Sequence, residues 1–478
     1  MMTVVRSMKR FSLGLLLAGS VLAGSAAPAA AQQAFSALDS TASPQVSFSS
    51  GDRAKPIQAG SQVEVSGEGF RPNQKVTLLY GATPLPGGAL TADGEGKIAG
   101  KIAVPANAPS GNHPIVVVAQ GPYHAIVQDL KVSPTIPLSG QDQYSLTEVQ
   151  AVRGLYQSAY SARNNALFVA AAIGRPPVKQ STLARLDADT LKVEASVTPQ
   201  PAPAQPPRDG APARDPGLYA VYGIGVDDSK GTVWVTNTRQ NTAAVYRQSD
   251  LSLIKQFEPG TVNHARDVVI DETLGKAYVS ATFAPEVVVF DTTKLEVAKR
   301  IAISSRQRGG EFSAASLSLD PAKHRLYVVS QSTNEVAVID TRTDRVENVF
   351  AVPGARSAIG VSHDPQTGRI FVAAQGSDNL IVLDGATGKV IADTPVGAGA
   401  LNVKFDPVKR RAYVSNRGAG TVAVTDVDGK IVANLGPAPL ANHVSLGRNG
   451  TVYAVDKSAG ARDAESDTIL KIVPRRSQ

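Results

Sequence analysis

The 478-residue sequence contains no cysteine, which excludes disulfide bonds, thiolate metal sites and covalent attachment of c-type haem. Aromatic residues make up only 5% of the chain. No apolar run after residue 31 approaches the roughly 20 residues that a membrane-spanning helix needs, so no span is expected in the mature chain. The fold must therefore depend on its hydrophobic core, and the length suffices for one ordinary domain together with a large all-β fold.

Motifs that mark common enzyme classes are also missing. The sequence has no H-E-x-x-H, no G-x-S-x-G, no Walker loop, and no G-x-G-x-x-G between a strand and a helix. The most basic run, "KRRAY" at 409–413, is typical of a solvated hairpin edge rather than a nucleic-acid face. The sequence leaves enzymatic activity open and favours its absence.

The first 31 residues have the composition of a secretory signal peptide. Arg6, Lys9 and Arg10 precede an apolar stretch at 11–27, and Ala29 and Ala31 fit a cleavage site after residue 31. A membrane anchor is the alternative, but the stretch is short and diluted by glycine and serine. We predict a periplasmic or secreted protein, whose net charge falls from +7 to a mild +4 once the three basic residues of this segment are removed.

Residues 45–133 alternate apolar and polar residues in short runs separated by turn residues, which predicts a small antiparallel β domain. The segment resembles bacterial immunoglobulin-like modules, whose early motif is matched here by Ala59, Gly60, Val63, Val65, Gly67, Gly69, Phe70 and Pro72. The resemblance implies a two-sheet sandwich that acts as a spacer or adhesion module. Residues 134–145 are expected to form a linker.

Residues 146–478 contain seven copies of a repeat centred on an aromatic residue: Phe168, Trp234, Tyr278, Tyr327, Phe371, Tyr413 and Tyr453. Seven residues before the aromatic lies an aspartate in five copies: Asp227, Asp271, Asp320, Asp364 and Asp406. Thirteen residues after it lies another in four copies: Asp291, Asp340, Asp384 and Asp426. Aspartates at such positions stabilise turns by accepting backbone N–H hydrogen bonds.

Each copy therefore predicts four short antiparallel strands, and seven such copies predict an all-β, seven-bladed β-propeller after the sandwich. A parallel α/β fold is excluded because no intervening segment is long or periodic enough for a crossover helix. The proline-rich stretch 198–217 is expected to be a solvated rim loop. For closure of the ring, the C-terminal strand either completes its own blade or pairs with a strand near Val132 or Val149.

The repeats resemble the YVTN β-propeller family, most clearly at 319–340 and 405–426, "LDPAKHRLYVVSQSTNEVAVID" and "FDPVKRRAYVSNRGAGTVAVTD". Among propellers, the chain is similar to the YncE-like periplasmic proteins. That resemblance implies a seven-bladed fold and allows DNA binding as a function, although propellers host many unrelated activities.

Channel residues should recur once per blade, and eleven residues before each aromatic lie Gln157, Gly223, Asp267, Ser316, Gly360, Asn402 and Asn442. None of them is apolar, and the favoured explanation is steric, because only small or polar side chains fit beside water at the axis. The alternative is that Asp267, Asn402 and Asn442 bind a hard cation such as Ca²⁺, as in lactonase-type propellers. Those enzymes use a further glutamate from the first blade, and no matching residue is found.

Two Asn-His pairs, Asn263-His264 and Asn442-His443, open innermost strands, and Arg356 takes the place of Asn263 two blades on. These residues would place two imidazoles and a guanidinium near one mouth of the channel, where a carboxylate or phosphate could bind. The alternative is that these are ordinary loop residues that bind no ligand.

The function predicted from the sequence is non-catalytic binding of a protein, peptide or envelope polymer at the propeller mouth by a monomer. No resident cofactor is expected, apart from the Ca²⁺ alternative. One competing hypothesis is a lactonase or lyase that depends on a divalent cation. The other is nucleic-acid binding, which follows from the family resemblance alone.

Overall fold

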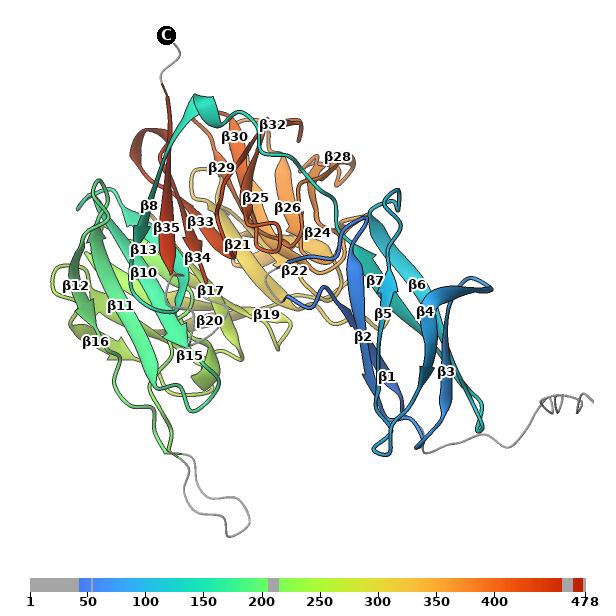
Figure 1. Cartoon of the computed structure of the whole chain (residues 1–478). Coiled ribbons are helices and arrows are strands. Elements are labelled where there is room, and N and C mark those ends of the chain that lie inside the picture. Colours follow the sequence, from blue (N-terminus) through green and yellow to red (C-terminus); the bar gives the residue numbers. More distant parts are fainter. Residues whose placement is uncertain (1–42, 53–54, 205–214, 458–466, 476–478) are drawn as a thin grey trace, which may run out of the picture.

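The computed structural model describes residues 43–52, 55–204, 215–457 and 467–475. The predicted signal peptide and the middle of the proline-rich stretch, 205–214, lie outside the described residues. The described parts form strands and three 3₁₀ turns: η1 (Gln141–Gln143), η2 (Thr238–Gln240) and η3 (Arg448–Gly450). They build a small sandwich and a larger ring of sheets, with the sandwich lying to one side of the ring (Figure 1). Within these ranges, no helix is long and apolar enough to cross a membrane.

The sandwich packs two antiparallel sheets against each other. One has the order β1 (Gln45–Ser49), β2 (Gln62–Glu68), β5 (Ile98–Ala103); the other has the order β4 (Thr83–Thr91), β3 (Lys75–Tyr80), β6 (Gly111–Gln120), β7 (His124–Val132). Alternate residues of each strand point inward, as the period of two requires. Val63 and Val65 of β2 thus share a buried core with Val76 and Leu78 of β3.

From residue 144 onward, the residues that the structure describes form seven four-stranded antiparallel sheets. The first three are β9 (Leu155–Ser161), β10 (Ala166–Ile173), β11 (Gln180–Asp187), β12 (Val193–Val197); β13 (Ile224–Asp227), β14 (Thr232–Asn237), β15 (Thr242–Arg247), β16 (Leu253–Gln256); and β17 (Ala265–Asp271), β18 (Lys276–Ala281), β19 (Glu286–Asp291), β20 (Glu296–Ala302). The next three are β21 (Ala314–Asp320), β22 (Arg325–Ser330), β23 (Glu335–Asp340), β24 (Arg345–Ala351); β25 (Ala358–His363), β26 (Ile370–Ala374), β27 (Asn379–Leu383), β28 (Val390–Pro395); and β29 (Ala400–Asp406), β30 (Arg411–Asn416), β31 (Thr421–Thr425), β32 (Ile431–Leu435). The last joins β33 (Ala441–Leu446), β34 (Val452–Asp456) and β35 (Thr468–Pro474) to β8 (Tyr144–Gln150).

The sheets form a closed ring. The first strand of each sheet contacts the first strand of the next, in the cyclic order β9, β13, β17, β21, β25, β29, β33 and back to β9. Strand β8 lies beside β35 (Figure 1), with Tyr144 opposite Pro474 and Val149 opposite Ile469. Of the two modes of closure left open by the sequence, the ring uses the strand that contains Val149. The predicted linker therefore ends at residue 143, because Tyr144 and Ser145 already belong to the ring.

The repeat landmarks have the structural roles expected of them. All seven repeat aromatics lie in the second strand of their sheet and are at most 3% exposed. Tyr278, for example, packs against Leu326 and Val328 of the following sheet, so the core lies between neighbouring sheets. The turn role of the aspartates is confirmed: Asp291 accepts hydrogen bonds from the N–H groups of Thr293 and Lys294 at 2.8 Å each.

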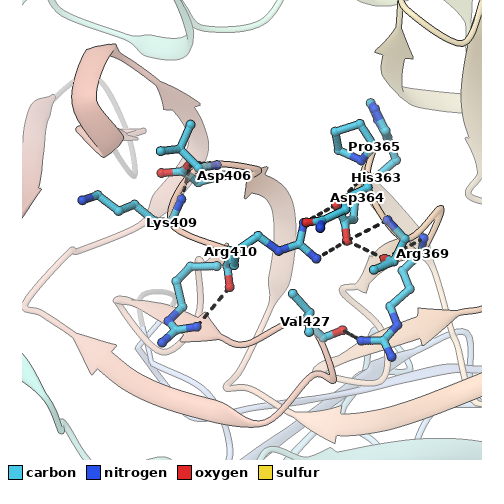
Figure 2. A network of polar contacts seen from close by, with 12 residues as sticks. His363, Asp364, Pro365, Arg369, Asp406, Lys409, Arg410 and Val427 are labelled. Atoms are coloured by element: carbon cyan, nitrogen blue, oxygen red, sulfur yellow. Dashed lines mark hydrogen bonds and ion pairs between the residues drawn. The ribbon is translucent and has the colours of Figure 1, made fainter.

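One turn aspartate also joins two sheets (Figure 2). Asp364, at the end of β25, has a fully buried side chain and accepts two hydrogen bonds from the Arg410 guanidinium, which projects from the hairpin after β29. Its carboxylate also accepts the Gln366 N–H at 3.0 Å and the Thr367 N–H at 3.3 Å. Although burial opposes ionisation, the Arg410 and Thr367 hydrogen bonds lower the pKa of Asp364 to about 2.

The sandwich is held against the rim of the ring by polar contacts. Lys131 of β7 donates to the buried Asp378 carboxylate at 2.8 Å, and Asp129 pairs with Arg356 at 2.8 Å. The segment between the two parts also contacts the ring, because the Asn434 amide donates to the Ile136 carbonyl at 2.9 Å. These contacts fix the orientation of the sandwich relative to the ring.

Candidate functional site

A ring of equivalent positions lines the channel, one from each innermost strand. In strand register, each lies opposite the residue two places after the repeat aromatic: Gln157, Gly223, Asp267, Ser316, Gly360, Asn402 and His443. The constant sequence spacing predicted Asn442 for the seventh position. Asn402 pairs with Ser415, thirteen residues later, whereas His443 pairs with Val455, twelve residues later, so His443 takes this position and Asn442 falls in a bulge.

Four ring side chains connect neighbouring sheets. Each accepts a hydrogen bond from a backbone N–H of the next innermost strand: Gln157 from Ile224 at 3.1 Å, Asp267 from Leu317 at 2.9 Å, Asn402 from Val444 at 3.1 Å, and His443 Nδ1 from Ser158 at 3.4 Å. Where the ring has glycine, the strands meet directly, since a Cβ on Gly223 would lie 2.2 Å from the Arg266 carbonyl oxygen. These contacts support the explanation that the residues at the channel-lining positions have a steric and structural role.

The three residues considered for Ca²⁺ have other partners. Both Asp267 oxygens accept backbone N–H hydrogen bonds, Asn402 Oδ1 accepts one, and the Asn442 amide donates to the Tyr156 carbonyl at 2.7 Å. A cation at these residues would compete with the contacts that join the sheets. Within the described ranges, no group of three or more histidine, aspartate or glutamate side chains has the arrangement of a metal site.

A cavity of about 340 Å³ lies in the channel, and Asp267, Lys404 and His443 are among the residues that line it. Burial raises the pKa of Asp267 and lowers the pKa of Lys404. The two opposite charges act against these shifts, because each charge favours the ionised form of the other residue. Burial, together with the Lys404 and Arg266 charges, lowers the pKa of His443 to about 3. His443 is therefore a neutral acceptor at neutral pH.

This assignment predicts a pH effect for His443→Asn. Between about pH 6.5 and pH 3 the unfolded chain binds a proton at this histidine that the folded chain does not, so acidification through this window destabilises the fold. Asparagine cannot titrate, and its amide can accept the Ser158 N–H as Asn402 accepts that of Val444. Urea unfolding should show that the variant loses about 2 kcal/mol less stability than the wild type between about pH 7 and pH 4.5. Equal losses would contradict the assignment.

At the mouth where the innermost strands begin, four cations surround two tyrosines. We call this group the mouth cluster: Tyr156 of β9, Tyr222 before β13, Arg239 of η2, Arg266 of β17, Arg417 after β30 and Lys457 after β34. The two tyrosine rings meet edge to face, with centroids 5.0 Å apart. Lys457 Nζ lies 4.3 Å from the Tyr156 ring centroid, and Arg239 Nε donates to the Tyr222 hydroxyl at 3.4 Å.

The charged side chains of the mouth cluster are all positive. Burial raises the pKa of Tyr156, but the Arg266, Lys457 and Arg417 charges outweigh it, so the pKa of this phenol is lowered. The pKa of Lys457 is lowered by burial and by the neighbouring guanidinium groups. Within the described ranges, none of the four cations forms an ion pair with a carboxylate, and the buried Nε of Arg266 has no hydrogen-bond partner.

The structure brings the residues predicted at the mouth together only in part. His264 stacks on Phe283, with ring centroids 3.9 Å apart, and burial together with the Arg239 and Arg266 charges lowers its pKa to about 4. Asn263 donates to the Phe283 carbonyl at 2.9 Å, so this pair flanks the mouth cluster. Arg356 instead pairs with Asp129 of the sandwich.

The sequence interpretation missed the four cations of the mouth cluster. Arg417 and Lys457 both lie four residues after a repeat aromatic, and Arg266 lies one residue before its ring position. These positions could have been used as a signal. The other five copies, however, have uncharged residues four places after the aromatic, so the cations at this position do not form a seven-fold pattern.

Comparisons with known proteins support the propeller fold. No known protein-family profile matches the chain. The chain is 24% identical to "Uncharacterized protein YncE" of Salmonella typhimurium strain LT2 over 342 residues, which is 67% of this chain and 88% of that protein. The corresponding protein of Salmonella typhi is 23% identical over the same length and with the same coverage.

Solved structures resemble the ring at low sequence identity. Hydrazine synthase of Kuenenia stuttgartiensis matches with a TM-score of 0.54 and 17% identity, over 69% of this chain and 98% of that one. Virginiamycin B lyase of Staphylococcus aureus matches with a TM-score of 0.50 and 10% identity, over 69% and 99%. At these identities the likeness concerns the fold alone: the chain contains a β-propeller.

Proposed function

We propose that this protein is a non-catalytic binding protein that takes carboxylate groups of a protein, peptide or envelope polymer at the mouth cluster. We further propose that the ring is a seven-bladed propeller of the YVTN type, that the sandwich is immunoglobulin-like, and that the protein is exported to the periplasm or beyond. The seven sheets with their repeating aromatics, and the low-identity YncE relatives, support this wider assignment. The observation that carries the binding function is the convergence of four cations that have no carboxylate partner among the residues that the structure describes.

Partial burial of the cations favours an anionic ligand at the mouth. Removing a charge from water is costly unless a partner of opposite sign or hydrogen bonds replace the lost hydration. Arg266, Arg417 and Lys457 are each partly buried, and burial lowers the pKa of the last two. An anion at the mouth would supply the missing charge, and arginine binds carboxylates particularly well because its planar donors can form paired hydrogen bonds.

The binding experiment uses a fluorescent oligoglutamate as probe and the double variant Arg417→Gln/Lys457→Gln. Wild type should bind the probe with an affinity that falls as salt rises, because the contacts are charge-assisted and screened. The double variant should bind at least about tenfold more weakly, since each lost charged contact contributes about 1.5 kcal/mol or more. Fluorescence anisotropy measures both.

The control is Lys389→Gln, which removes one positive charge from an exposed hairpin residue that is distant in sequence from all six residues of the mouth cluster. It should bind within about twofold of wild type, since exposed charges contribute little. Equal affinities of wild type and the double variant would contradict the proposal. Strong preference for a single-stranded oligonucleotide over oligoglutamate would instead favour the nucleic-acid hypothesis.

A further inference from the structure

A second cavity of about 610 Å³ lies between the sandwich and the rim of the propeller. The sandwich contributes the end of β1 and the following loop, with Phe48, Ser49 and Ile57, and the propeller contributes loop residues including Leu440. We call this cavity the interdomain cleft. Two ion pairs, Lys131–Asp378 and Arg356–Asp129, join the sandwich to the propeller beside this cleft.

The interdomain cleft and the mouth cluster share one residue. Arg417 lines the cleft and also belongs to the mouth cluster, where it is among the charges that lower the pKa of Tyr156. The backbone N–H groups of Arg417 and Gly418 are already bonded to the Gly399 and Ala398 carbonyls, so the guanidinium is the group available to a ligand at this junction. A molecule in the cleft would therefore have one end directed at the cations.

The lining of the interdomain cleft fits a peptide better than a polysaccharide. The lining combines apolar residues such as Ile57 and Leu440 with polar and charged residues such as Ser49, Asp129 and Lys131, and such a mixture suits varied side chains. Sugar rings usually bind on exposed flat aromatic faces. Among the described residues that line the cleft, the aromatic one is Phe48. Its side chain packs against the sandwich core instead.

We propose that the ligand is a peptide whose C-terminal carboxylate enters the mouth cluster while its preceding residues lie in the interdomain cleft. This inference rests on the proposed function and adds the substrate class and the contribution of the sandwich. Capture of a chain end is a known mode of peptide recognition, and here the compact group of cations would receive the terminal carboxylate.

The test is a competition between two synthetic pools of N-acetylated short peptides with identical random sequences, one with free and one with amidated C-termini. Immobilised full-length protein should retain the free form at least about tenfold over the amide, because amidation removes the charge that the guanidinium and ammonium groups bind. Mass spectrometry of the retained peptides gives the ratio. Equal retention of the two pools would overturn the inference.

A pair of bulky substitutions on one strand tests the cleft itself. Ser49→Trp should fill the interdomain cleft from the exposed end of β1 and reduce retention of the free pool about fivefold or more, as expected when a partner's apolar contacts are blocked. Ser47→Trp adds the same bulk two residues earlier, outside the cleft lining, and should retain peptides as the wild type does. Equal retention by the two variants would overturn the role of the cleft.

The outcomes separate this inference from the proposed function. If oligoglutamate binds in the wild type and not in Arg417→Gln/Lys457→Gln, the mouth binds anions whatever the peptide pools show. If the free and amidated pools are retained equally while oligoglutamate still binds, the inference of C-terminal peptide binding is excluded and the proposed function stands. If oligoglutamate does not bind, the proposed function fails together with the inference.

Discussion

Replacing β8 with a glycine-serine segment of equal length should abolish cooperative folding of the propeller. This strand supplies the fourth strand of the last sheet and pairs with β35 over seven residues, from Gln150 opposite Thr468 to Tyr144 opposite Pro474. Tyr144 is also buried and meets Tyr413 of the preceding sheet edge to face, with ring centroids 6.5 Å apart. Net hydrogen-bond contributions of about 1 kcal/mol each, added to the lost burial, approach the 5–15 kcal/mol stability of a typical domain.

A rescue variant separates strand pairing from other effects of the replacement. Appending the sequence of residues 144–150 after residue 475 through a short turn lets it pair antiparallel to β35 from the other end of the chain. Thermal unfolding followed by circular dichroism should show that the transition of the propeller is lost in the replaced chain and restored in the rescued one. A wild-type transition in the replaced chain would contradict closure by β8.

Asp364→Ala should lower the free energy of unfolding by about 3–5 kcal/mol, the range for breaking a buried ion pair from one side. The substitution removes the acceptor of the Arg410 guanidinium and of two backbone N–H groups (Figure 2). The pKa of Asp364, at about 2, lies below that of an unfolded aspartate. Its stabilising effect is therefore present above about pH 4 and is lost as the pH falls toward 2.

Asp384→Ala is the matched control for Asp364→Ala. Asp384 accepts N–H hydrogen bonds from Ala386 and Thr387 in the same kind of turn, but no arginine or lysine forms an ion pair with it in the described chain. Its loss should cost only about 1 kcal/mol. Urea unfolding of both variants and of Arg410→Ala gives the comparison, and a cost below about 1 kcal/mol for Asp364→Ala would show that the inter-sheet pair does not stabilise the ring.

The elements predicted well from sequence are those fixed by local, repeated physics. An aromatic such as Tyr278 is buried between sheets in every copy, and a turn aspartate such as Asp291 satisfies nearby N–H groups in four of the seven copies. Both requirements recur at constant spacing, so they were visible as periods. The channel position of the seventh sheet was misplaced by one residue because the bulge of β33 lies at Asn442, eleven residues before Tyr453, whereas the bulge of β29 lies at Leu401, twelve residues before Tyr413.

The mouth cluster and the position of the sandwich could not be predicted from repeats in the sequence. Arg266, Arg417 and Lys457 come from three different sheets and meet only because the ring closes, so no local period connects them. Arg356 was expected at the mouth from its place in the repeat, yet it pairs with Asp129 in another part of the chain. Such partners follow from the assembly of the whole chain rather than from local sequence.

A crystal structure of the protein soaked in bromide, with anomalous diffraction locating the ion, shows whether the mouth cluster is an anion site. We expect a bromide in contact with Arg266, Arg417 and Lys457 in the wild type, and none there in Arg417→Gln/Lys457→Gln. A mouth without bromide, or one in which a carboxylate of the chain itself pairs with these cations, would contradict this expectation.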